Sequence, residues 1–302
     1  MKTAAEVNYV AERLVRERGR EGGRKRRIPG FLRLGGLPYY VALLIVSAIV
    51  LSAVVPHWLA PYPPAEMNAD ALLRKPGPDH WFGTDYYGRD VLSLLIYGAR
   101  DSLLIGAGSV VIGGAAGMLI GSLAGYIGGL ADGILMRIID VLMTIPGLLL
   151  SLAIAAALGP SLLNIVLAVS VSLIPKFARV VRSQVISIKS RPYIAASRSI
   201  GAGGGHIFVK HVLPHVLSPL LVMATIGIGS SILVGSALSF LGLGVLKEIP
   251  DWGTLLSQGR GYLTVAWWNA TFPGLAITIL VLAVNLLGDR WRDALDPKQH
   301  VK

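Results

Sequence analysis

Six stretches of the chain are apolar and long enough to cross a lipid bilayer as α-helices. The first, residues 37–59, has 23 residues. As a helix it measures about 34 Å, which exceeds the ~30 Å thickness of the hydrocarbon core of a bilayer. The other apolar stretches are residues 102–128, 134–158, 162–180, 216–243 and 270–287. We therefore expect an all-α integral membrane protein with six transmembrane helices.

The composition favours a membrane protein over a soluble one. Of the 302 residues, 53% are hydrophobic and 15% are charged, whereas soluble domains carry about 25% charged residues. The second apolar stretch contains six glycines between residues 106 and 121. Small residues let helix backbones approach closely in lipid, so this pattern predicts a packed bundle. The chain has no cysteine, which excludes disulfides and thiolate metal sites.

The distribution of positive charge predicts the orientation. Of the 28 Lys and Arg residues, 22 lie in the N-terminal tail, at Arg137, in residues 176–215 or after Asp289. The other six lie in the alternate loops, which six spans would place on the opposite side of the membrane. Short loops rich in Lys and Arg stay in the cytoplasm, so both termini are expected inside. The net charge of +11 then reflects topology and attraction to membrane lipids, and nucleic-acid binding is not expected. The predicted regions are a basic cytoplasmic tail 1–36, a first transmembrane helix 37–59, an extracytoplasmic loop 60–100, a five-helix core 101–291 and a cytoplasmic C-terminus 292–302.

The cytoplasmic segment 181–215 contains a short polar helix signal and no acidic residue. Ser190 or Arg191 can cap this helix, Pro192 suits its first turn, and Gly201 can end it in a left-handed conformation. Its positions i, i+3, i+4 and i+7 form a stripe of mostly small residues, namely Tyr193, Ala196, Ser197 and Ile200. Such a helix suits docking into a groove on a partner, although a solvated helix without a partner has the same pattern. Residues 203–205, all glycine, predict a loose joint before the next helix.

The segment resembles the cytoplasmic coupling motif of permeases from ATP-binding cassette (ABC) importers. In that motif Glu-Ala-Ala is followed by Gly and then by a distant Leu-Pro. Here Ala195 stands in place of the usual Glu, and Ser197 in place of the second Ala. The matching positions are Ala195, Ala196, Ser197, Gly201, Leu213 and Pro214.

Further stretches, in order from about residue 35 to 297, are similar to the dipeptide/oligopeptide/nickel permease family. The last of them is typical of the second, C-type, permease subunit. They are "FGTDYYGRDVLSLLIYGARDSLLIG" at 82–106, "MRIIDVLMTIP" at 136–146, "LSFLGLG" at 238–244, "DWGTLL" at 251–256 and "LLGDRWRDALDP" at 286–297.

The resemblance implies a type I ABC importer permease fold with a cytoplasmic coupling helix, in the inner or plasma membrane of a prokaryote. It implies a heterodimer with a second permease, two cytoplasmic ATPase subunits that bind ATP and Mg, and an extracytoplasmic binding protein that delivers di- or oligopeptides. This chain would then be a non-catalytic subunit that binds no cofactor or metal itself. The residues expected to contact the ATPase are Tyr193, Ile194, Ala195, Ala196, Ser197, Arg198, Ile200, Gly201 and Ala202.

Other polar residues allow a functional and a structural interpretation. Asp85, Arg89 and Asp90 are candidates for an extracytoplasmic contact or for orienting the helix that follows. Asp289 and Arg292 are candidates for contact with the ATPase or the coupling segment, or for a solvated terminus. Arg137 and Asp140 are expected to form an ion pair three residues apart, and Trp252, Trp267 and Trp268 are expected at the outer interface of the membrane.

Two alternatives remain at this point. Within the same architecture, the solute could be nickel or another small molecule. A secondary transporter that needs no ATPase is the alternative from another class, but it predicts inverted repeats and broken spans with charged residues at the membrane midplane, and neither is evident in the sequence.

Overall fold

The structure, a computed structural model, describes residues 36–245 and 247–295. The chain divides into two units, residues 1–36 and 37–302. The predicted basic tail 1–36, except for its last residue, and most of the predicted C-terminus 292–302 lie outside the described residues.

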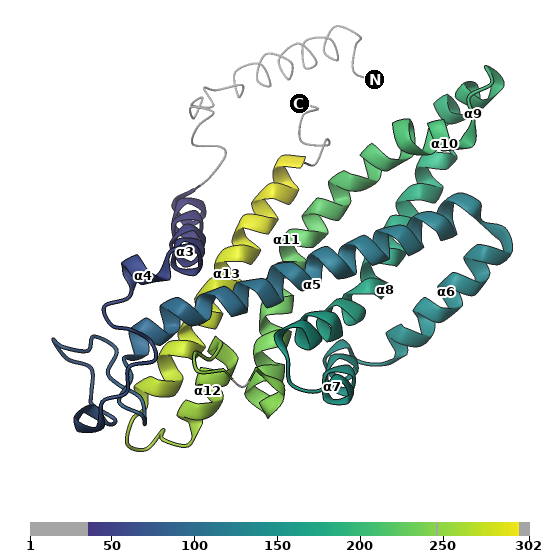
Figure 1. Ribbon diagram of the computed structural model, residues 1–302. Helices are drawn as coiled ribbons and strands as arrows, with labels where there is room; N and C mark the ends of the chain where they lie inside the picture. Colours follow the sequence, from purple (N-terminus) through teal and green to yellow (C-terminus); the bar gives the residue numbers. More distant parts are fainter. Residues whose placement is uncertain (1–35, 246, 296–302) are drawn as a thin grey trace, which may run out of the picture. The chain divides into compact units, whose positions relative to one another are not determined.

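The described part of the second unit is helical and contains no β-strand (Figure 1). The long helices are α3 (Leu37–Val54), α5 (Val91–Ile127), α6 (Gly129–Thr144), α7 (Gly147–Leu158), α8 (Leu162–Lys189), α11 (Leu213–Leu238) and α13 (Trp268–Leu295). The shorter helices are α4 (Pro56–Leu59), η1 (Ala69–Ala71), α9 (Pro192–Ser199), α10 (Gly204–Ile207), η2 (Phe208–Val212), η3 (Ser239–Leu243) and α12 (Trp252–Arg260). Among the described residues, five helices are long and apolar enough to cross a membrane, or up to six if the bent pair α6–α7 counts as one span. The predicted all-α membrane architecture is confirmed.

A row of glycines explains the close packing of α5 against α8. Gly113, Gly117, Gly121 and Gly125 recur every four residues and therefore share one face of α5. A Cβ atom at Gly117 would lie 2.5 Å from the Cβ of Phe177, and one at Gly121 would lie 2.3 Å from the carbonyl oxygen of Ala178. The close approach predicted from the glycine-rich stretch is thus confirmed, with α8 as the neighbour.

The predicted third span, residues 134–158, is not one helix. It consists of α6 and α7, which meet at an angle of 92°. Pro146 lacks an N–H group and disfavours a helical conformation at the preceding residue. Ile145 is accordingly extended, with φ −93° and ψ 126°, and ends α6.

Two other predicted boundaries also differ. The helix of the second span begins at Val91 instead of residue 102, because Asp90 caps it by accepting a hydrogen bond from the N–H of Ser93 at 2.8 Å. The helix after α9 begins at Gly204 instead of Ile207, so the predicted joint ends at Gly203, which caps α10, and Gly204 and Gly205 belong to the helix. A continuous helical segment, Gly204–Leu243, runs through the π-helical turn η2 at Phe208–Val212.

Candidate functional site

The coupling segment, defined here as residues 181–215, forms a turn at one end of the bundle (Figure 1). Helix α8 ends at Lys189, α9 follows with Pro192 in its first turn, and α10 leads back toward α11. Arg191 occupies the cap position of α9 without a side-chain capping bond. Gly201 has φ +88°, so the left-handed helix end predicted from the sequence is confirmed.

One buried side chain fixes α9 to the bundle. Ile194 is 1% exposed and belongs to a cluster with residues from α8, α10, η2 and α11. The other members of this cluster are Val181, Val185, Ile188, Ile207, Val212 and Val216. Full burial of an isoleucine side chain contributes about 1.5–3 kcal/mol. Ile194, which the sequence grouped with the contact residues, is therefore an anchor.

The remaining face of α9 is open. Tyr193, Ala195, Ala196 and Arg198 are exposed, and Ile200 just after the helix is 87% exposed. Ser197 is half-buried, and its hydroxyl donates to the carbonyl oxygen of Tyr193 at 2.9 Å. Ala202 packs on the buried cluster. A short helix whose inner face is anchored by Ile194, and whose outer face exposes small residues and Ile200, is a suitable docking element.

Two residues outside the sequence-predicted set brace this turn. The hydroxyl of Tyr126, near the end of α5, donates to the carbonyl oxygen of Gly204 at 2.6 Å. The ammonium of Lys189 donates to the backbone carbonyl of Tyr126 at 2.6 Å and lies over its ring. The contact links residues 63 positions apart, and no local sequence signal could have indicated it.

Helix α6 is joined to α8 close to the coupling segment by two ion pairs. The guanidinium of Arg182 donates to both carboxylate oxygens of Asp132, at 2.5 and 2.6 Å. Asp140 pairs with Arg179 at 2.6 Å. The predicted pairing of Asp140 with Arg137 is therefore wrong, because the neighbouring helix presents a guanidinium to this carboxylate.

At the opposite end of the bundle, the predicted contact residues Asp85, Arg89 and Asp90 are all buried. Arg89 donates through Nε to Asp85 at 2.7 Å and through a terminal nitrogen to the carbonyl oxygen of Glu248 at 2.9 Å. Asp90 caps α5 and lies 3.0 Å from the imidazole of His80. These residues organise the loop before α5, as the structural interpretation expects, and their part in an extracytoplasmic contact stays a prediction.

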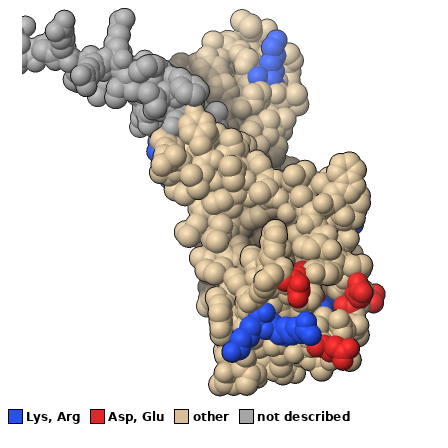
Figure 2. All heavy atoms as spheres, turned by 90° about the vertical axis from the view of Figure 1, so that its left-hand side faces the viewer, with Lys and Arg blue, Asp and Glu red and all other residues tan. Residues whose placement is uncertain are grey.

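The exposed charges at this end lie elsewhere in the loop. Figure 2 shows acidic and basic side chains close together on the lower part of the molecule. The exposed charged residues between positions 60 and 90 are Glu66, Asp70, Arg74, Lys75 and Asp79.

Two of the three tryptophans predicted at the membrane interface are structural. Trp252 and Trp268 are 2% and 1% exposed. Their indole nitrogens donate to the carbonyl oxygens of Leu95, at 2.8 Å, and Thr84, at 3.0 Å. Trp267 alone of the three is exposed. Burial with a satisfied N–H shows that Trp252 joins α12 to α5 and that Trp268 joins α13 to the loop, instead of anchoring the protein in headgroups.

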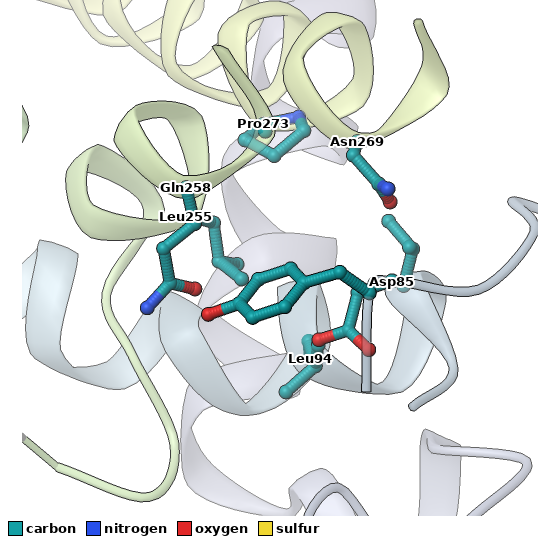
Figure 3. A pocket seen from close by; sticks show the side chains of 9 residues that line it. Asp85, Leu94, Leu255, Gln258, Asn269 and Pro273 are labelled. Carbon is teal, nitrogen blue, oxygen red and sulfur yellow. The ribbon is translucent and has the colours of Figure 1, made fainter. Parts of the chain in front are cut away.

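A small hollow lies between this loop, α12 and the start of α13 (Figure 3). Tyr86 is one of the residues that line it, and burial raises the pKa of its hydroxyl to about 12. Asn269 is 5% exposed, and neither its side-chain oxygen nor its nitrogen has a partner among the described residues; the same holds for Oε1 of Gln258. Buried amides of this kind are ordinarily satisfied by ordered water.

Asp289 and Arg292 are both exposed near the C-terminal end of α13. The structure therefore leaves them accessible, and their contact with an ATPase or with the coupling segment stays a prediction.

The folded chain, with its bundle of apolar helices and its turned-out helix α9, has the architecture of the membrane subunits of ABC transporters. It superposes on a chain of the methionine transporter MetNI in inward-facing conformations with a TM-score of 0.55 at 22% identity, covering 68% of this chain and 97% of that chain. A chain from an amino acid ABC transporter crystallised with histidines gives a TM-score of 0.52 at 15% identity, covering 68% and 93%.

The sequence comparison defines the family. Residues 117–301 match the binding-protein-dependent transport system inner membrane component. The chain belongs to this family, and it is thus a multi-pass protein of the prokaryotic plasma membrane. Its relatives include dipeptide transport system permease protein DppC of Escherichia coli (strain K12), 48% identical over 264 residues, covering 85% of this chain and 88% of the relative. The di/tripeptide transport system permease protein DppC of Pseudomonas aeruginosa (strain UCBPP-PA14) is 47% identical over 262 residues, covering 85% and 86%. The probable D,D-dipeptide transport system permease protein DdpC of Escherichia coli (strain K12) is 41% identical over 266 residues, covering 88% and 89%.

Proposed function

We propose that this chain is one of two permease subunits of an ATP-driven importer for dipeptides or short oligopeptides. The relatives named above support this substrate class, since each is named for dipeptide or di/tripeptide transport and covers nearly the same length of chain. The observation that carries the mechanism is α9, a helix with one buried anchor and an otherwise open face.

In this mechanism α9 is the element through which an ATPase acts on the membrane helices. When two ATPase subunits close on ATP and Mg, they move α9. Helices α8 and α10 carry that movement into the bundle, because the cluster of Ile194 joins α9 to α8 and the hydroxyl of Tyr126 holds the start of α10. The chain itself contributes no catalytic group and binds no cofactor. A binding protein delivers the peptide at the opposite end, where the exposed charges of residues 60–90 offer a polar surface.

Co-purification tests the assembly. The tagged chain, expressed with its neighbouring genes and extracted in detergent, should bring down a second permease and two ATPase subunits. Vesicles that contain the complex and its binding protein should take up labelled dipeptide when ATP is supplied. Uptake of nickel in place of dipeptide would assign the solute to the other branch of the family, and uptake without any ATPase would refute the proposal.

Gly201 provides the sharper test of α9. A side chain at Gly201 meets no atom within 4 Å but is strained by the φ of +88°, a conformation that costs L-residues roughly 1–2 kcal/mol. Gly201→Val should therefore displace the end of α9 and lower peptide uptake per ATP hydrolysed in reconstituted vesicles. The matched control is Gly205→Val, which also meets no atom within 4 Å and has no positive φ. Equal coupling in both variants would contradict the assignment of α9.

A further inference from the structure

The elbow, defined here as residues 143–149, comprises the end of α6, the start of α7 and the break between them. No other part of the described chain covers its side chains. All seven of its residues are exposed. Ile145 and Pro146 leave the helical conformation, and α7 begins without a side-chain cap. The first N–H groups of a helix and the last carbonyls of the preceding one have no partners within their own helices. The elbow therefore presents polar backbone to whatever surrounds the chain.

The elbow lies deep along the bundle. A Cβ atom at Gly147 would be 3.7 Å from the Cβ of Ser172. Ser172 is ten residues beyond Leu162, the first residue of α8, which corresponds to about 15 Å along the helix axis. A hydrocarbon core is ~30 Å thick, so the elbow is close to the middle of the membrane.

Lipid cannot cover a stretch of this kind. Irregular backbone at membrane depth occurs only where it is buried in protein or lines a water-filled cavity, because an unsatisfied peptide group in hydrocarbon costs several kcal/mol. The elbow cannot avoid the membrane interior by lying outside it, because the apolar helices α6 and α7 on its two sides together form one broken span. The surroundings of the elbow must therefore be either protein or water.

A lysine beside the elbow decides between these two surroundings. Lys176 lies four residues after Ser172, so it shares that face of α8. Its side chain is exposed, and among the described residues it forms no ion pair or hydrogen bond. The nearby Asp140 is engaged by Arg179. Lys176 lies 14 residues beyond Leu162, about 21 Å along α8 and therefore about 9 Å short of the far edge of a ~30 Å hydrocarbon core. A free ammonium there requires water, and ionisable groups within membranes mark solute pathways.

We propose that the elbow and Lys176 line the water-filled pathway that this chain forms with its partner permease, where the ammonium meets the carboxylates of passing peptides. This inference rests on the proposed function and adds which surface of the chain the solute contacts.

Cysteine accessibility tests the elbow directly, because the chain has no cysteine of its own. Ile145→Cys and Leu149→Cys are introduced singly into the assembled complex in vesicles, together with Leu44→Cys on α3 as the control. All three wild-type side chains are exposed, and Leu44 is 69% exposed on an apolar helix. A charged, water-soluble methanethiosulfonate should modify both elbow cysteines at least about tenfold faster than the control, since only a hydrated thiol ionises to the reactive thiolate.

Two results would overturn the inference. Elbow cysteines as unreactive as the control would place the elbow in lipid. Unreactive cysteines that instead cross-link to the second permease would place it in a subunit contact. In either case, retained ATP-dependent dipeptide uptake by the same variants would leave the proposed function intact, so the two failures can be told apart.

Lys176 is tested by its charge. Lys176→Gln should lower dipeptide uptake several-fold, whereas Lys176→Arg should retain it, with the ATPase still co-purifying in both cases. Lys176→Cys should regain uptake after reaction with an aminoethyl thiosulfonate, which restores a positive charge. Normal uptake by Lys176→Gln would remove the lysine from the pathway, and loss of the ATPase from the complex would show a role in assembly instead.

Discussion

Asp251 combines two opposing effects in one carboxylate. It caps α12 by accepting hydrogen bonds from the N–H of Gly253 at 2.8 Å and from the N–H of Thr254 at 3.2 Å. The hydroxyl of Thr254 donates a further bond at 2.8 Å. Burial nevertheless raises the pKa of the Asp251 carboxyl, because desolvation disfavours the charged form more than these bonds favour it. The cap therefore stabilises α12 while its ionisation costs free energy.

A pH-dependent difference follows for Asp251→Asn. A carboxyl whose pKa is raised on folding stabilises the protein most below its unfolded pKa of about 3.9, and this stabilisation is lost as pH rises through the folded value. Asparagine caps a helix as well as aspartate and cannot ionise. The thermal midpoint of Asp251→Asn, measured in detergent, should therefore rise relative to wild type as the pH increases above about 4.

The control for this prediction is Asp251→Ala, which cannot ionise either but removes the cap, and which should be about 1 kcal/mol less stable than Asp251→Asn at every pH. A fall of the Asn variant relative to wild type with rising pH would show that the hydrogen bonds outweigh desolvation.

At the residue scale, the sequence predicted helix ends better than side-chain environments. Pro192 and Gly201 mark the ends of α9 because backbone constraints are local. The burial of Asp85, Arg89 and Asp90 was not predictable, since it depends on Glu248, distant in sequence, and on the fold of the loop. The role of Ile194 was missed for the same reason, because the other residues of its cluster come from four different elements.

At the scale of elements, the attachment of α6 to α8 depends on few contacts. Ile139 is the only buried residue among those of α6, all of which the structure describes. The pairs Asp132–Arg182 and Asp140–Arg179 therefore carry much of the attachment. The first pair is bidentate and partly buried, whereas both side chains of the second are more than half exposed.

Charge exchange across these pairs tests the attachment. Asp132→Arg and Arg182→Asp should each lower thermal stability, and the double variant should recover most of the loss, with a coupling energy of about 1.5–3 kcal/mol for a charged hydrogen-bonded pair. The same exchange at Asp140 and Arg179 should give about 0.2–1 kcal/mol, because exposed pairs are screened by solvent. Equal coupling energies at the two sites would contradict this ranking.

Hydropathy predicted where the elements lie but not their continuity. Residues 134–158 are apolar apart from Arg137, Asp140 and two hydroxyl side chains, and hydropathy does not distinguish a straight helix from a bent pair. Pro146 was the local signal for the bend, but a proline can kink a helix or end it, and the packing of α7 on α8 decides between these outcomes. The start of α5 was misplaced because residues 91–101 include polar side chains that a hydropathy criterion rejects.

At the scale of the whole molecule, orientation remains a prediction from charge. The described chain places the coupling segment and the loop of residues 60–90 at opposite ends of the bundle (Figure 1). The coupling segment contains five Lys and Arg residues and no Asp or Glu, whereas the loop carries both signs. This asymmetry agrees with a cytoplasmic coupling segment.

Reporter fusions test this orientation. A phosphatase reporter, active only outside the cytoplasm, should be active when inserted within residues 60–80 and inactive when fused after Lys302. A fluorescent reporter that matures in the cytoplasm should give the reverse pattern. Signals from the same side at both positions would contradict the proposed topology.

The length of α5 sets how far the working parts stand from the bilayer. Its 37 residues extend over about 55 Å, and still over roughly 50 Å at a common tilt of ~20°. Since the fatty-acyl layer takes up only ~30 Å of this, some 20 Å of helix must project beyond it. An ATPase that binds α9 would thus act at the end of a projecting helical segment, beyond the lipid headgroups. Such a segment would act as a lever arm between the ATPase and the solute pathway.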